Sequence, residues 1–142
     1  MASTVERFRA AVEQRDRAAL EGLFAPGVRF FSPVKFTPFE GLPTVLGVFG
    51  VLLTRVFDEF RYVGEMAGTV ELDNGEPAMS HLLVFRAVVG GKQVHGIDLI
   101  QLDEAGLIKE FTVMVRPQRA LTALSDAVLA GLVAEGLVPP AG

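Results

Sequence analysis

Apolar residues recur at helical spacing at both ends of the chain. Near the N-terminus Val5, Phe8 and Val12 lie on one face of a predicted helix, with Thr4 as a candidate N-cap. Asp16 is the candidate cap of a second, short helix that ends near residue 25. At the other end, leucines and valines between residues 121 and 132 predict an amphipathic helix up to about residue 135.

The middle of the chain predicts one more helix and several strands. Residues 44–57 are apolar on most sides and favour a helix. Strands are predicted, in chain order, over residues 28–36, 59–66, 79–89, 92–102 and 107–116. Gly90-Gly91 separates the third and fourth of these strands and is typical of a two-residue hairpin turn.

The order of these elements predicts an α+β fold. Helices come first and strands later, so we expect helices packed on one face of a curved antiparallel sheet. The 142 residues fit a single domain over residues 1–142, with residues 136–142 as a flexible tail.

Composition and charge exclude several classes of function. The net charge of −4 does not favour nucleic acid as a partner, and the absence of cysteine excludes disulfides and thiolate chemistry. The longest apolar run, residues 45–53, is too short to cross a bilayer, so no membrane partner is expected. Without a recognisable signal segment, we expect a cytoplasmic protein.

Asp98 is the main candidate for chemistry, because it interrupts an otherwise apolar strand. An ionised carboxylate is costly there unless it is paired or hydrogen-bonded, so Asp98 is paired, protonated or facing a cavity. A two-residue turn at 90–91 places Leu83 opposite Asp98, Phe85 opposite Gly96 and His81 opposite Ile100.

That register puts His81 diagonal to Asp98 on one face of the hairpin, within reach of a long side chain. His81 is therefore a candidate base oriented by Asp98; the alternative is a histidine hydrogen-bonded at the sheet surface. A shift of one residue would keep Asp98 on the face and remove His81 from it. No metal site is predicted, because the two histidines lie fourteen residues apart without a ligand pair at helical spacing.

The predicted elements resemble the cone fold of the nuclear transport factor 2-like superfamily. Residues 5–34 are similar to the opening segment of its ketosteroid isomerase and SnoaL-like polyketide cyclase group, and residues 96–106 are similar to the strand with the oxyanion donor and the following turn. The resemblance covers residues 4–116. It implies a cone-shaped, curved antiparallel (mixed) sheet wrapped around the N-terminal helices, with an added C-terminal helix, and a homodimer.

Carried over by position, the resemblance keeps one of three catalytic groups. Phe8 stands where the isomerase has a donor tyrosine, and Ser32 stands where it has the proton-transferring aspartate. Asp98 matches the carboxylic acid that the isomerase keeps neutral in an apolar site. A serine takes no proton from carbon without a base beside it, so the familiar steroid isomerase mechanism is not expected.

The resemblance therefore implies a cofactor-free pocket for a small hydrophobic molecule, with isomerisation or cyclisation by proton transfer if the protein is an enzyme. Asp98 and His81 are the catalytic candidates, and the candidate ligand-binding residues are Phe8, Phe30, Ser32, Leu83, Phe85, Phe111, Val113 and Val115. The alternative is a non-catalytic ligand-binding or dimerisation module. A weaker resemblance, to limonene epoxide hydrolase, would need an Asp-Arg-Asp arrangement.

Overall fold

The computed structural model describes residues 2–138. In chain order its elements are α1 (Thr4–Glu13), α2 (Arg17–Glu21), β1 (Phe24–Phe31), β2 (Phe39–Glu40), α3 (Leu42–Val51), the π-helix η1 (Leu52–Val56), β3 (Asp58–Glu71), β4 (Pro77–Val89), β5 (Lys92–Leu102), β6 (Ile108–Arg116) and α4 (Gln118–Ala134).

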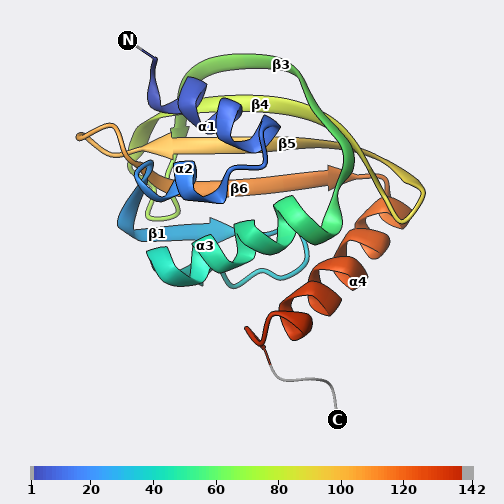
Figure 1. Cartoon of the computed structure of the whole chain (residues 1–142). Coiled ribbons are helices and arrows are strands. Elements are labelled where there is room, and N and C mark those ends of the chain that lie inside the picture. Colours follow the sequence, from blue (N-terminus) through green and yellow to red (C-terminus); the bar gives the residue numbers. More distant parts are fainter. Residues whose placement is uncertain (1, 139–142) are drawn as a thin grey trace.

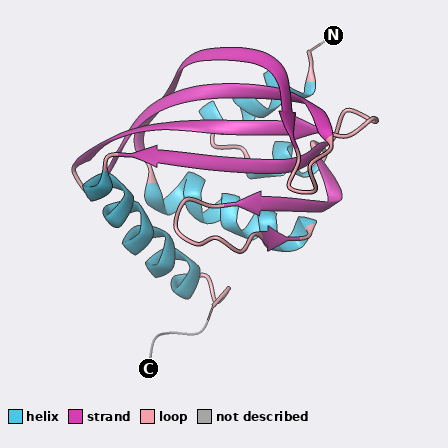
Figure 2. Ribbon diagram, turned by 180° about the vertical axis from the view of Figure 1, so that it is seen from behind, coloured by secondary structure: helices cyan, strands magenta, loops and turns pink. Residues whose placement is uncertain are grey.

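The strands form one sheet in the order β2-β1-β6-β5-β4-β3. The β1–β6 pair is parallel and the other pairs are antiparallel. The sheet curves around the helices: α1, α2 and α3 lie on its concave side in Figure 1, and the same sheet covers them when seen from behind in Figure 2. The expected α+β fold, with a curved mixed sheet and an added C-terminal helix, is confirmed.

The hairpin register is also confirmed. Leu83 pairs with Asp98, Phe85 with Gly96, and His81 with Ile100, across β4 and β5. Gly90 and Gly91 both have positive φ angles, of 54° and 77°, as the two-residue turn requires.

Several boundaries differ from the predictions. The N-cap of α1 is Ser3, whose hydroxyl accepts the Glu6 N–H, while the Thr4 hydroxyl donates to the Gly106 carbonyl. β1 begins four residues early, at Phe24, because Ile108 N–H donates to Leu23 O and joins this segment to β6. The predicted 44–57 helix starts at Leu42 and changes to π-helix at Leu52.

Aromatic side chains make the centre of the core. The face of α1 that carries Phe8 is buried against the sheet, as the helical spacing predicts. Phe8 lies 5.2 Å from Phe111 between ring centroids, Phe30 stacks on Phe111 at 5.4 Å, and Phe49 of α3 meets Phe111 edge to face at 5.2 Å. These rings belong to one continuous hydrophobic core between the helices and the sheet.

Helix α4 closes the side of the cone that the sheet leaves uncovered. Leu124 and Val128 are buried on its inner face, and Gly131 packs directly on Val51 of α3, with no room for a Cβ atom. Beyond the helix, Leu137 N–H donates to Leu132 O. Of the predicted tail 136–142, residues 139–142 lie outside the described residues.

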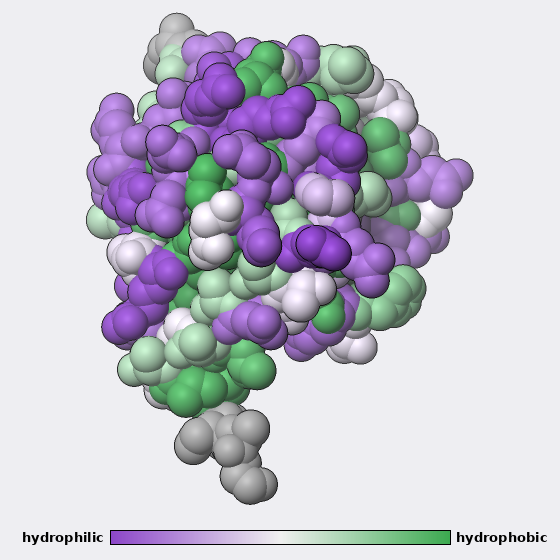
Figure 3. Space-filling model, turned by 90° about the vertical axis from the view of Figure 1, so that its right-hand side faces the viewer, coloured by the Kyte–Doolittle hydropathy of each residue, from purple (hydrophilic) through white to green (hydrophobic). Residues whose placement is uncertain are grey.

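Polar side chains cover much of the surface seen in Figure 3, and apolar ones gather next to the C-terminal end. Leu129 of α4 and Leu137 beyond its end are about half exposed. In the part of the chain that the structure describes, no helix is long and apolar enough to cross a membrane.

Candidate functional site

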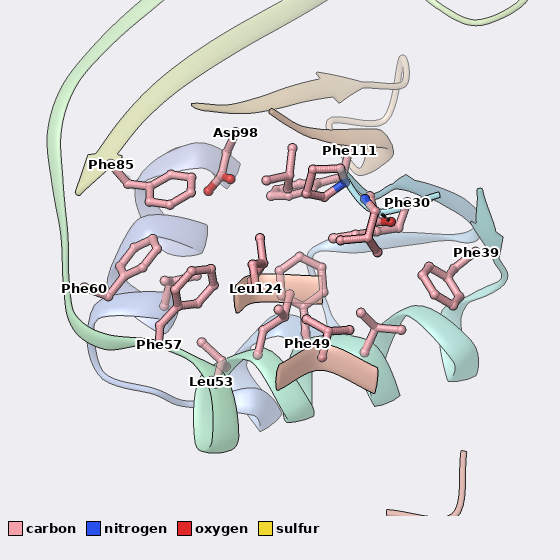
Figure 4. Close-up of a pocket in the computed structure, with 18 of the residues that line it drawn as sticks. Phe30, Phe39, Phe49, Leu53, Phe57, Phe60, Phe85, Asp98, Phe111 and Leu124 are labelled. Atoms are coloured by element: carbon pink, nitrogen blue, oxygen red, sulfur yellow. Dashed lines mark hydrogen bonds between the residues drawn. The ribbon is translucent and has the colours of Figure 1, made fainter. Parts of the chain in front are cut away.

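An apolar cavity of about 60 Å³ lies between the concave face of the sheet, the α3–η1 segment and α4 (Figure 4). Seven phenylalanines contribute to its wall: Phe30, Phe39, Phe49, Phe57, Phe60, Phe85 and Phe111. Aliphatic residues of α3, η1 and α4 complete it, among them Leu53 and Leu124. The π-helix matters here, because Leu52 and Leu53 both line the cavity and such irregular turns are frequent at functional sites.

Asp98 is the acidic group of this cavity. It lies on the inward face of β5, between Gly96 and Ile100, and is 5% exposed. In Figure 4 its carboxylate points into the space between Phe85 and Phe111. Burial raises the pKa of Asp98 from 3.8 to about 7, although the hydrogen bond from Tyr62 opposes that rise. Near neutral pH the carboxyl group therefore exchanges its proton, which suits an acid or base.

Tyr62 of β3 is the hydrogen-bond partner of Asp98. Its hydroxyl donates to Asp98 Oδ2 at 2.7 Å inside the core. Burial and the neighbouring Asp98 raise the pKa of Tyr62 well above 10, so the phenol stays protonated and keeps donating. A stacked pair, Phe60 and Phe85, packs next to it, with Phe60 edge to face on Tyr62.

The sequence reasoning missed Tyr62. A signal was present, because Phe60 and Tyr62 alternate with charged residues in a strand, and alternation places both on one face. Tyr62 is also the one tyrosine of the chain. The alternation alone does not say which strand lies beside this one. Tyr62 reaches Asp98 across β4, and it does so because Tyr62 of β3 pairs with Phe85 of β4.

Gly96 explains how Phe85 reaches the cavity. A Cβ atom at residue 96 would collide with the ring of Phe85 and lie 2.9 Å from Met114 O. The ring therefore lies directly over the backbone of β5, two residues before Asp98, and forms the wall beside the carboxylate.

The structure brings together five of the predicted ligand-binding residues: Phe30, Ser32, Phe85, Phe111 and Val113 line the cavity. Ser32 Oγ accepts the N–H of Val34 at 3.3 Å, which leaves its own O–H free to donate.

Three other predicted ligand-binding residues do not line the cavity. Phe8 and Leu83 are fully buried in the core, and the ring of Phe8 packs against Phe49 and Phe111. Val115 packs against the edge of the core and is partly exposed.

His81 also lies outside the cavity, although its register is as predicted. It lines a shallow surface hollow with Ala67 and Met79, near the far end of the β3–β4 hairpin. Between the described residues no hydrogen bond joins His81 to Asp98, whose partner is Tyr62. The strand register determined which face His81 occupies, but the curvature of the sheet carries this part of β4 beyond the cavity.

Two other kinds of site, a metal site and an Asp-Arg-Asp hydration site, can be tested against the described residues. Over residues 2–138, no three His, Cys, Asp or Glu side chains lie close enough to hold a metal ion. Asp98 is the one carboxylate among the described lining residues, so the Asp-Arg-Asp arrangement of a hydration site is not formed.

Solved structures share this architecture. No family model and no curated protein matches the sequence. A protein with a cystatin-like fold from Silicibacter pomeroyi is 33% identical, with a TM-score of 0.83 over 96% of this chain and 90% of its own. A steroid delta-isomerase from Pseudomonas aeruginosa is 32% identical, with a TM-score of 0.79 over 95% of this chain and 93% of its own.

The chain belongs to the nuclear transport factor 2-like superfamily. Within it, the similarity is to the ketosteroid isomerase and SnoaL-like group. A nuclear transport factor 2-like protein of unknown function from Mesorhizobium loti has the same fold at 19% identity, with a TM-score of 0.65 over 80% of this chain and 88% of its own. Such nuclear transport factor 2-like cones share the fold, so the contents of the cavity decide what each protein does.

Proposed function

We propose that this nuclear transport factor 2-like protein binds a small hydrophobic molecule whose oxygen atom meets Asp98, and that Asp98 transfers a proton to or from it. The observation that carries the proposal is a carboxyl group buried in an apolar cavity with a pKa of about 7. A protonated Asp98 donates a hydrogen bond to a carbonyl or enolate oxygen, and an ionised Asp98 accepts a proton. The reaction class is then a cofactor-free isomerisation or cyclisation.

The polar groups support one defined ligand orientation. Tyr62 holds Asp98 Oδ2 at 2.7 Å, which leaves Oδ1 for the ligand. Ser32 follows Phe31, which pairs with Thr112 of β6, while Val113 pairs with Asp98. The Ser32 and Asp98 backbones are therefore about 10 Å apart, two strand spacings. A second polar atom on the ligand can meet the Ser32 hydroxyl, with apolar surface between the two.

Ligand entry requires movement. A cavity of about 60 Å³ is small beside the roughly 300–1,000 Å³ of most small-molecule pockets. A ring-sized ligand needs more space, and we expect it from displacement of α4 or of the Phe57 and Phe60 side chains, which are partly exposed.

The alternative is a non-catalytic binding module with the same cavity. It is favoured because the other catalytic groups of the isomerase are not matched: Phe8 replaces the donor tyrosine, Ser32 replaces the base, and the predicted base His81 lies elsewhere. In that case Asp98 and Tyr62 recognise the ligand without reacting with it.

Deuterium exchange separates the two proposals. The protein is incubated with cyclohexanone in D₂O, and incorporation at the α-carbons is followed by NMR. Proton transfer by Asp98 is supported if the protein exchanges deuterium faster than buffer does, if Asp98→Asn loses this acceleration, and if His81→Gln keeps it. Binding of 2-naphthol that is sensitive to Asp98→Asn, without any accelerated exchange, supports the binding module. If Asp98→Asn changes neither exchange nor binding, both proposals fail.

We also propose a homodimer formed through the outer face of the sheet. Val84, Ile97 and Met114 pair across three strands there, and Met114 is 55% exposed. An apolar row of this kind is typical of subunit contacts. Sedimentation of wild type should give a dimer and Met114→Lys a monomer. The control Met79→Lys, at a residue 66% exposed near the start of β4, should not change the mass. A monomeric wild type would contradict the proposal.

A further inference from the structure

The cavity carries one cationic side chain. Arg15 lines it from the turn between α1 and α2, beside Val12 of the last turn of α1. Among the described lining residues Arg15 alone is exposed, so it marks the side on which the cavity meets solvent. Asp98 at the buried side and Arg15 at the solvent side thus line the same apolar cavity.

The Arg15 guanidinium has hydrogen-bonding capacity to spare. Its Nη2 atom donates to the Phe57 carbonyl at 3.2 Å, which positions it at the start of β3. Asp58 and Glu59 follow Phe57 in the chain, yet no carboxylate of the described residues lies within 4.0 Å of Arg15. A guanidinium has five N–H donors, so four remain for a ligand.

The backbone fixes the position of Arg15 at the end of α1. Arg15 has a φ angle of 54°, in the left-handed region where glycine or asparagine is the easier choice. The turn holds it there, because Arg15 N–H donates to Val12 O and Asp16 N–H donates to Ala11 O. These two bonds form the Schellman cap of α1, in which the residue after the C-cap ordinarily has a positive φ angle, so the end of the helix fixes where the Arg15 side chain begins.

We infer that the ligand is an apolar molecule with an anionic head group, a carboxylate in the first place, which Arg15 holds at the solvent side while the other end reaches Asp98. This inference rests on the proposed function, since it names the ligand class of the same cavity. A planar carboxylate matches the fork of a guanidinium, and at this position it keeps part of its hydration.

Matched probes test the head group. We would measure the affinities of 2-naphthoate and of its neutral counterpart 2-naphthamide by calorimetry, in wild type, Arg15→Gln and Arg15→Lys. Wild type should prefer 2-naphthoate by about tenfold, as a charge-assisted hydrogen bond provides. Arg15→Gln should abolish the preference and Arg15→Lys should restore part of it. Arg7→Gln, an exposed arginine of α1 outside the cavity, is the control and should not change it.

The outcomes distinguish a failure of the anionic head group from a failure of the proposed function. Equal affinity for the two probes, or a preference that survives Arg15→Gln, overturns the anionic ligand; if 2-naphthol binding still depends on Asp98, the proposed function stands. If none of the three naphthalene probes binds, both are overturned. Raising the salt concentration should weaken the naphthoate preference alone, because an exposed ion pair is screened.

Discussion

The Tyr62 hydroxyl donates a 2.7 Å hydrogen bond to Asp98 Oδ2 in the interior of the cone. The two residues are 36 positions apart and come from β3 and β5, which are separated by β4. This pair is the polar centre of a cavity that is otherwise almost wholly apolar, and it sets the proton affinity of the site.

Asp98→Asn should make stability less dependent on pH. The folded-state pKa of about 7 lies above the ordinary 3.8, so the folded protein binds the proton more tightly than the unfolded chain. Wild type should therefore lose stability as pH rises from about 4 to 7, by about 4 kcal/mol for a shift of three units. Asparagine has no such titration. Urea unfolding at pH 4.5, 6 and 8 should show that the free energy of unfolding of the variant rises relative to that of wild type as the pH increases. A constant difference between the two proteins at all three pH values would contradict a buried, titrating Asp98.

Tyr62→Phe should raise the pKa of Asp98 further, because the hydrogen bond from the phenol stabilises the carboxylate. The loss of stability should be about 1 kcal/mol at pH 5, where Asp98 is neutral, and about 2–3 kcal/mol at pH 8, where the bond is charge-assisted. NMR titration of the Asp98 carboxyl carbon measures the pKa directly. A pKa that stays the same or falls would show that the bond does not stabilise the charged form.

Gly96→Ala should destabilise the fold by about 1–3 kcal/mol, since the added methyl group overlaps the Phe85 ring and approaches Met114 O. It should also weaken ligand binding, because the displaced ring enters the cavity. Gly68→Ala on β3 is the control: nothing lies within 4 Å of its added methyl group. Thermal unfolding of both variants checks the pair, and equal losses would contradict the close packing at Gly96.

Leu124→Ala should enlarge the cavity from the α4 side. Leu124 is 2% exposed and lines the cavity, so its truncation should cost about 2–5 kcal/mol and let ring-sized ligands bind more tightly. Leu129→Ala on the same helix removes a side chain that is 53% exposed and should change stability by less than about 0.5 kcal/mol. Urea unfolding and 2-naphthol binding measure both effects. Unchanged 2-naphthol binding in Leu124→Ala would show that α4 does not limit access.

His81→Gln should leave deuterium exchange and ligand affinity as in wild type, because His81 lies in a surface hollow away from the cavity. Exchange rates with cyclohexanone between pH 5 and pH 9 check this. A loss comparable to that of Asp98→Asn would mean that His81 reaches the ligand in the bound state.

The sequence by itself determined the fold class, the hairpin register and the inward direction of Asp98. These are local properties: side chains alternate along a strand, and the Gly90-Gly91 turn sets which residues of β4 and β5 pair. The same register predicted that Phe85 shares the face of Asp98, and Phe85 is buried.

Only the tertiary structure decided which inward residues meet. His81 and Asp98 share a face but not a cavity, because the sheet curves away between them, whereas Tyr62 reaches Asp98 across an intervening strand. Arg15 joins the cavity through the packing of the α1–α2 turn on the start of β3. Curvature and helix packing depend on the sum of many distant contacts, and no short stretch of sequence contains them.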